Sequence, residues 1–300
     1  MDLWIVATLA AALFQTFRFM LQKVLASGPL SATGSTFARF AYAIPGAVLV
    51  LAGYLWATGT LVPTVGSAFW GWAYLGGVSQ ILATVLVVLL FKSRNFAVGI
   101  TLKKTEVIQT ALLGLVLLGE TITPGGWLAI GLGLAGVLML SQTPGLVDDI
   151  WQALRSRAVL LGVASGFFFA ISGIGYRAAS LTVDSVDPLL RAGVTLLSVN
   201  VMQVLTLWPW LVWREPGQVV AVWRARKTAI WLGVTSMLGS LGWFTAFTLQ
   251  TAAYVFALGQ VELIFSLIAS VVFFKETVTR REVTGIAILA ASILLLVFLA

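Results

Sequence analysis

The feature that most constrains this chain is a series of apolar runs, each about as long as a membrane is thick. A bilayer core about 30 Å thick requires roughly 20 residues of helix. The runs cover residues 3–25, 35–56, 68–91, 96–118, 125–142, 158–178, 188–212, 228–249, 252–274 and 282–299. Because lipid cannot satisfy backbone N–H and C=O groups, each run is predicted to be an α-helix. The sequence therefore predicts an all-α membrane protein with ten transmembrane helices.

The composition supports this class. Of the 300 residues, 60% are hydrophobic and 10% are charged, whereas a soluble domain has about 25% charged residues. A soluble fold with so few charges would expose large apolar patches. We therefore expect a multi-pass protein of the cell's inner (plasma) membrane, with no loop long enough for a separate soluble domain.

Several functional classes are excluded by what the sequence lacks. It contains no Cys and no His, which removes thiolate metal sites, Cys nucleophiles and His-based acid–base chemistry. No P-loop motif of an ATP-driven pump occurs. The basic residues (18, against 11 acidic) fall in short clusters between apolar runs, a pattern typical of membrane loops. We expect no cofactor, no metal, no enzymatic activity and no nucleic-acid partner.

The two halves of the chain resemble each other. The offset that aligns Glu106 with Glu262 also aligns Glu120 with Glu276, together with the apolar run between each pair. We therefore predict two five-helix repeats, residues 1–148 and 149–300. An odd number of spans per repeat inserts the second repeat from the opposite face. Inverted-topology repeats are common in secondary transporters, whose sites lie near the midplane between the repeats.

The spacing of a few small and acidic residues resembles a known family. In the first half Leu118-Gly119-Glu120 is followed by Ala129 and Gly136, and in the second half Lys275-Glu276 is followed by Gly285 and Ser292. This pattern is similar to that of the ten-helix drug/metabolite transporter superfamily, EamA type. The resemblance implies export or exchange of small metabolites, and relatives commonly keep both termini in the cytoplasm. The basic residues instead gather opposite the termini, which by the positive-inside rule predicts termini outside.

Two carboxylates are expected near mid-depth. Glu106 and Glu262 each lie about ten residues into a predicted helix, where a charge costs about 3 kcal/mol on insertion scales. Lys103 can pair with Glu106 at i,i+3, Lys104 is adjacent, and Gln109 continues the same face. One hypothesis makes both Glu residues proton-coupling sites, with a lysine binding a substrate carboxylate or phosphate. The alternative makes them buried polar groups that lock two helices together.

Other polar residues inside the spans are candidates for binding the substrate. Gln15, Arg18 and Gln22 align on one face of the first helix. Gln260 takes the position of Lys104 in the second half. The remaining candidates are Gln80, Ser172, Tyr176 and Trp243.

Four further charged residues are expected to be structural. Arg39 and Arg191 lie near the starts of their helices, which suggests interface anchoring or helix capping. Glu120 and Glu276 lie at helix ends and are expected to stabilise turns.

These observations predict a secondary transporter that moves a small organic metabolite by alternating access as a functional monomer, with protons as a possible coupling ion. Lys and Arg beside Glu suit a zwitterion such as an amino acid. An exchanger of organic anions or phosphorylated metabolites, based on Arg18, Lys103 and Lys104, is the first alternative, and an organic-cation exporter is the second. A membrane-embedded enzyme and a channel or scaffold are more remote alternatives.

Overall fold

The computed structural model describes residues 2–91, 103–140, 157–265, 268 and 279–299. The helices are α1 (Leu3–Ser27), α2 (Ala32–Ala41), α3 (Ala43–Thr58), α4 (Ser67–Phe91), α6 (Glu106–Leu118), α7 (Pro124–Leu140), α9 (Arg157–Leu181), α10 (Pro188–Arg214), α11 (Gln218–Arg224), α12 (Arg226–Leu249), α13 (Ala252–Gly259) and α15 (Arg280–Leu299). Every predicted apolar run coincides with a helix over at least part of its length.

The chain is an all-helical, multi-pass membrane protein. Six helical segments are long and apolar enough to cross a bilayer, and α2 and α3 together form one of them. The shorter apolar helices are Glu106–Leu118, Pro124–Leu140, Ala252–Phe265 and Val283–Phe298. Within the described ranges, extended pairing is limited to an isolated bridge between Val65 and Val183.

The distribution of polarity is inverted relative to a soluble protein. Large apolar side chains such as Leu49, Val116 and Phe298 are 73–83% exposed, whereas Arg18 and Gln22 are at most 3% exposed. This arrangement is stable when the surrounding solvent is lipid, because apolar side chains can face lipid while polar groups pair in the interior.

Local signals explain where the helices begin and bend. The Ser31 hydroxyl accepts a hydrogen bond from the Gly34 N–H (2.9 Å) and caps α2. Asp187 caps α10 in the same way, with Pro188 in the first turn. The run predicted as residues 35–56 is divided at Tyr42 into α2 and α3. A side-chain carbon on Gly233 would lie 2.5 Å from the Tyr42 backbone, so α12 packs directly against this break.

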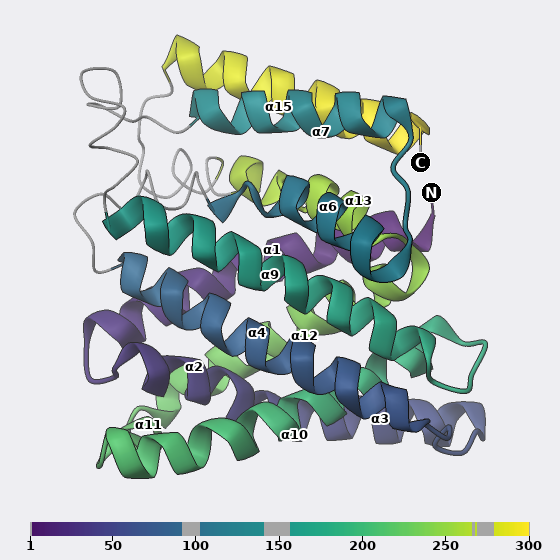
Figure 1. The fold of residues 1–300 in the computed structure, drawn as a ribbon. Helices are drawn as coiled ribbons and strands as arrows, with labels where there is room; N and C mark the ends of the chain where they lie inside the picture. The colour runs from purple at the N-terminus through teal and green to yellow at the C-terminus, as the bar shows by residue number, and fades with distance from the viewer. Residues whose placement is uncertain (1, 92–102, 141–156, 266–267, 269–278, 300) are drawn as a thin grey trace.

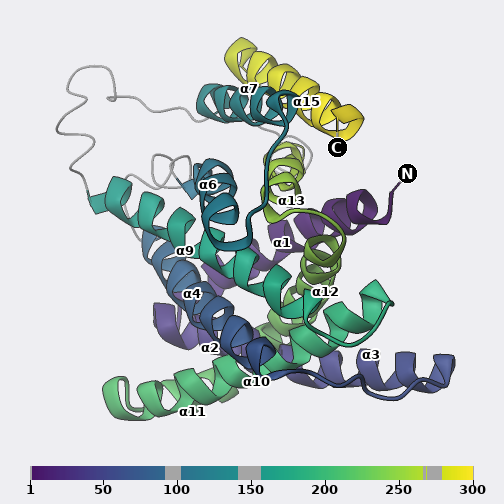
Figure 2. The same cartoon turned by 45° about the vertical axis from the view of Figure 1, so that its right-hand side comes forward.

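The helices pack in pairs formed by segments distant in sequence. α1 packs on α12, α4 packs on α9, and α7 packs on α15. Figures 1 and 2 show α7 and α15 side by side at one edge, with the two chain termini at the same end of the molecule. Between that pair and the rest of the bundle lie α6 and α13, which also contact each other.

Glycines permit the closest of these contacts. A side-chain carbon on Gly175 of α9 would lie 2.9 Å from the Cα atom of Gly76 on α4. One on Gly136 of α7 would lie 2.9 Å from the Gly285 carbonyl oxygen on α15. Gly131, also on α7, has nothing within 4 Å of the same position. The helix backbones therefore meet directly at Gly76–Gly175 and Gly136–Gly285, as expected for close packing in membranes.

These contacts predict different outcomes for two Gly→Ala substitutions. Gly175→Ala would force α9 away from α4, and we expect a loss of about 1–3 kcal/mol of unfolding free energy, typical of overpacking. Gly131→Ala should be neutral or slightly stabilising, because Ala is the better helix former. Thermal unfolding in detergent micelles measures both variants. Equal stability of the two variants would contradict the close α4–α9 contact.

Candidate functional site

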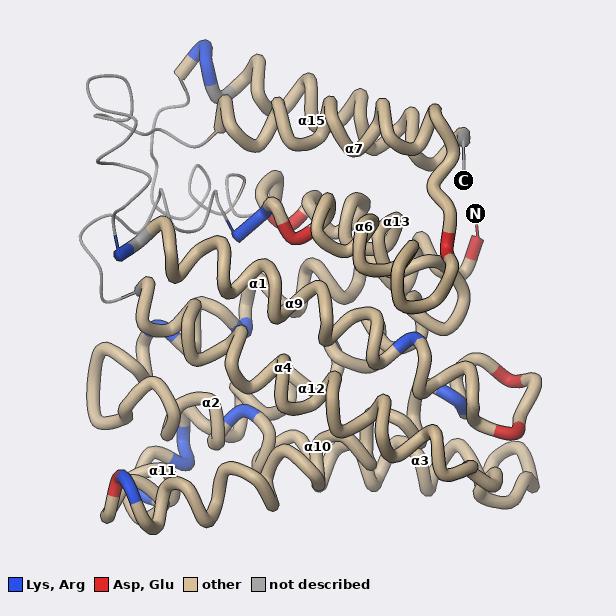
Figure 3. The backbone as a smooth tube through the Cα atoms, viewed as in Figure 1, with Lys and Arg blue, Asp and Glu red and all other residues tan. Residues whose placement is uncertain are grey.

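Charged groups meet in the interior beside the start of α6. Basic and acidic residues are sparse along the helices, but both kinds lie together at this point (Figure 3). Lys103, Lys104 and Glu106 are 3–4% exposed. Lys103 Nζ lies 3.0 Å from Glu106 Oε1, which confirms the predicted i,i+3 pair. Ion pairing partly offsets the free energy of placing these charges in the interior.

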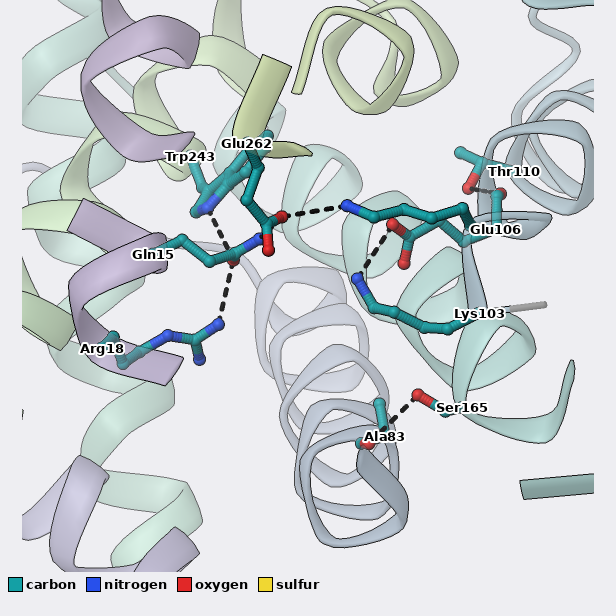
Figure 4. Close-up of polar contacts among 10 residues, drawn as sticks. Gln15, Arg18, Ala83, Lys103, Glu106, Thr110, Ser165, Trp243 and Glu262 are labelled. Carbon is teal, nitrogen blue, oxygen red and sulfur yellow. Dashed lines mark hydrogen bonds and ion pairs between the residues drawn. The ribbon is translucent and has the colours of Figure 1, made fainter. Parts of the chain in front are cut away.

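The second ion pair connects the two halves of the sequence. Lys104 Nζ lies 3.0 Å from Glu262 Oε2, on the helical turn that follows α13. The Gln15 side-chain amide also donates to Glu262 Oε2, at 2.8 Å. Glu262 has no cation within its own turn, so its partners come from α1 and from the segment that precedes α6 (Figure 4). This carboxylate therefore holds three distant segments together.

Gln15 links the charge network to Arg18 and Trp243. Its amide oxygen accepts from Arg18 Nη2 at 2.9 Å and from Trp243 Nε1 at 3.1 Å. The other terminal nitrogen of Arg18, Nη1, is buried without a hydrogen-bond partner, and so are both amide atoms of Gln22. The predicted polar face of α1 is thus buried in the bundle, and Figure 4 shows Arg18 and Gln15 pointing toward α6.

A small cavity adjoins this network. Its volume is about 20 Å³, which is about enough for one water molecule. Five of the predicted substrate-binding residues line it: Gln15, Gln80, Ser172, Tyr176 and Trp243. Aromatic rings complete the wall, and Trp243 stacks on Phe247 with ring centroids 5.9 Å apart. The cavity is therefore polar on one side and aromatic on the other.

A hydrogen-bonded cluster lies at the polar side of the cavity. Tyr176 Oη donates to Gln80 Oε1 at 2.9 Å. The Gln203 side-chain amide donates to Gln80 Oε1 at 3.0 Å and to the Gly77 carbonyl at 3.1 Å. Gln203 was not among the predicted residues, although a Gln inside the run 188–212 is itself a signal of a buried polar site.

Two predicted residues point elsewhere. Gln109 donates to Thr105 Oγ1 at 2.9 Å and packs against Gly166 of α9. Gln260 is 2% exposed and faces Gly133 of α7. Both are buried, but neither lines the cavity.

Arg39 differs from its predicted role. It was expected to anchor or cap a helix near the membrane interface, yet it is 2% exposed. Its guanidinium donates to Ser236 Oγ and Thr84 Oγ1, both at 2.9 Å. The reason is that α2 begins at Ala32, earlier than the predicted start at residue 35, so Arg39 lies at the inner end of α2.

Arg191 and Glu120 make contacts with neighbouring loops and helices. Arg191 donates to the Ser185 carbonyl in the loop before α10. Glu120, in the loop after α6, pairs with Arg177, which also donates to the Phe247 and Gln250 carbonyls at 2.7 Å each. Glu276 lies outside the described residues.

Comparisons with known proteins agree with the fold. The sequence model of the EamA-like transporter family matches residues 156–298, which confirms the resemblance seen in the sequence and makes the second half of the chain similar to a family of transporters. A solved structure titled only "Crystal structure of protein" superposes with a TM-score of 0.66 over 98% of this chain and 97% of its own, at 15% identity. At that identity it supports the fold alone. No curated protein sequence matches.

The ion pair between Lys104 and Glu262 predicts strong coupling between the two residues. Lys104→Met should destabilise the protein by about 3 kcal/mol, because it leaves a buried carboxylate without its cation. The double variant Lys104→Met/Glu262→Gln should recover part of that loss. Unfolding free energies in a denaturing-detergent titration give the coupling energy.

The control for this cycle is Lys227→Met, which removes an exposed lysine and should change stability little. If the destabilising effects of Lys104→Met and Glu262→Gln were additive, the interaction between the two residues would be contradicted.

Proposed function

We infer that this chain, whose second half belongs to the EamA-like transporter family, works as a secondary transporter of a small organic anion by alternating access. The observation that carries this proposal is the small cavity beside a buried network with more positive than negative charges. We propose further that the chain acts as a monomer in the inner (plasma) membrane, with ten spans in two inverted repeats, residues 1–148 and 149–300.

Reciprocal contacts support the inverted repeat. Under the sequence repeat, Ala129 corresponds to Gly285, and Gly136 to Ser292. Ser292 Oγ donates to the Ala129 carbonyl at 2.7 Å, and Gly136 packs on the Gly285 carbonyl. These two contacts exchange when the repeats exchange, as a pseudo-twofold axis between α7 and α15 requires. The α1–α12 and α9–α4 pairs are related in the same way.

The size of the cavity supports alternating access. Binding sites for small organic molecules measure about 300–1,000 Å³, whereas this cavity measures about 20 Å³. The helices must therefore move apart to admit a metabolite. Gln15 comes from the first half and Trp243 and Phe256 from the second, so relative movement of the halves would open the cavity between them.

The state of the charges favours an anion over the expected zwitterion. Each buried carboxylate is already paired with a lysine, so an incoming ammonium group would have to displace that lysine. The Arg18 guanidinium, in contrast, contacts a neutral amide and has one nitrogen without a partner. A zwitterion remains the alternative if Glu106 or Glu262 exchanges its lysine for the substrate during transport.

We propose that protons or a counter-substrate supply the energy and that Glu262, with Glu106, is the coupling carboxylate. The test is transport by purified protein in liposomes, using labelled dicarboxylates, sugar phosphates and amino acids as probes. We expect saturable exchange of an anion and faster uptake when a proton gradient is imposed. Glu262→Gln should retain substrate exchange, but its gradient-driven uptake rate should fall at least tenfold.

The matched control is Glu120→Gln, which neutralises a carboxylate in a loop after α6 and should leave both rates within about twofold. Unchanged gradient-driven uptake in Glu262→Gln would remove the coupling role. Flux that does not saturate would indicate a channel and contradict the proposed function.

A further inference from the structure

The buried charges do not balance in the part of the chain that the structure describes. Among the described residues, the buried cations are Arg18, Arg39, Lys103 and Lys104, and the buried carboxylates are Glu106 and Glu262. Each of these side chains belongs to a residue at most 8% exposed. The two lysines neutralise the two carboxylates in pairs. Four cations against two carboxylates leave the described interior with two more positive than negative charges.

Neither arginine has a carboxylate partner in the described part of the chain, where the ion pairs are Lys103–Glu106, Lys104–Glu262 and Arg177–Glu120. Arg18 donates to Gln15 and lies 4.4 Å from the Phe19 ring centroid. Arg39 donates to two hydroxyl groups and lies 4.8 Å from the Phe40 ring centroid. Amides, hydroxyls and rings carry no charge, and burying a charge without a counter-charge is strongly unfavourable.

Neither arginine lines the cavity, but each is linked to residues of its wall. Arg18 binds Gln15, which lines it. The Arg39 partners, Thr84 and Ser236, lie one helical turn from two other lining residues, Gln80 and Ser240. Each arginine is therefore connected to a polar residue of the cavity wall, Arg18 by a hydrogen bond and Arg39 through the helices of its two partners.

Gln22 adds hydrogen-bonding capacity one turn beyond Arg18. It follows Arg18 by one turn on the same face of α1 and is fully buried. Both its amide oxygen and its amide nitrogen lack a partner, as does Arg18 Nη1. Buried polar groups are nearly always hydrogen-bonded, so these side chains have donors and an acceptor available for a polar ligand.

We propose, on the basis of the proposed transport function, that the substrate is a doubly charged anion whose negative groups are bound by Arg18 and Arg39, with Gln22 as an additional donor. Two negative charges neutralise the two arginines, and guanidinium groups suit carboxylate and phosphate oxygens. The organic part of the substrate packs against the aromatic wall at Trp243 and Phe247. Phosphate monoesters and dicarboxylates share this chemistry.

The test compares probes that differ in charge but hardly in shape. Phenyl phosphate is compared with phenyl sulfate, and succinate with monomethyl succinate, in thermal-shift titrations of the purified protein at pH 7.5 in a chloride-free buffer. We expect the dianion of at least one pair to bind at least tenfold more tightly than its monoanion. The pair that shows the preference identifies the source of the charge as a phosphate monoester or a dicarboxylate.

Substitution of one arginine should change this charge preference. Arg39→Gln should weaken dianion binding at least tenfold and leave monoanion binding within about threefold, because one positive charge remains. Arg39→Lys should retain the dianion preference. Arg191→Gln, which removes a cation outside the cavity, is the control and should behave like the wild type.

Three results would overturn the proposal. The first is equal affinity for the monoanion and the dianion of both pairs, and the second is an equal loss of affinity for monoanion and dianion in Arg39→Gln. The third is that chloride alone, added in a separate titration, produces the full stabilising shift. The first of these needs no variant, so a folding defect cannot hide it. Saturable transport of monoanions in liposomes would then leave the proposed function standing. Dianion binding without flux of any probe would support the site and contradict the transport function.

Discussion

The ion pair between Lys104 and Glu262 is the interaction on which the rest of the site depends. It joins the segment before α6 to the turn after α13, and through Gln15 it also fixes α1. In a protein surrounded by lipid, apolar surface gives little discrimination between one helix arrangement and another, because lipid is as apolar as the side chains. Buried polar contacts can therefore specify which helices meet and at which depth.

The sequence predicted an all-helical membrane protein, the positions of the apolar helices and the charges that lie inside them. Run length and the lack of water in the bilayer constrain both directly. The Lys103–Glu106 pair was also accessible, because i,i+3 spacing fixes its geometry within one turn. The partner of Glu262 could not be predicted in this way, because Lys104 lies in the other half of the chain and only tertiary packing brings the two residues together.

Arg39 and Gln203 mark where sequence patterns were insufficient. Hydropathy predicted one continuous run over residues 35–56. Arg39 lies near the start of that run and therefore resembles a residue at the membrane interface. The Ser31 cap starts the helix earlier, and the break at Tyr42 lets α12 approach, so Arg39 reaches Ser236 in the interior. Gln203 was overlooked because a single amide in a 27-residue helix changes the hydropathy of the run very little.

The excess of buried cations over buried carboxylates and the small volume of the cavity together explain why such a carrier would exchange substrates. Reorientation moves the binding site through an environment of low dielectric constant, where two uncompensated charges are costly. With a doubly charged anion bound at Arg18 and Arg39, the described interior is neutral, and the halves can move without exposing bare charge to lipid. Without the anion, the same movement has a high electrostatic free energy. On the proposed function, the substrate is therefore both the cargo and the counter-charge that permits movement, and each transit favours a return with another anion.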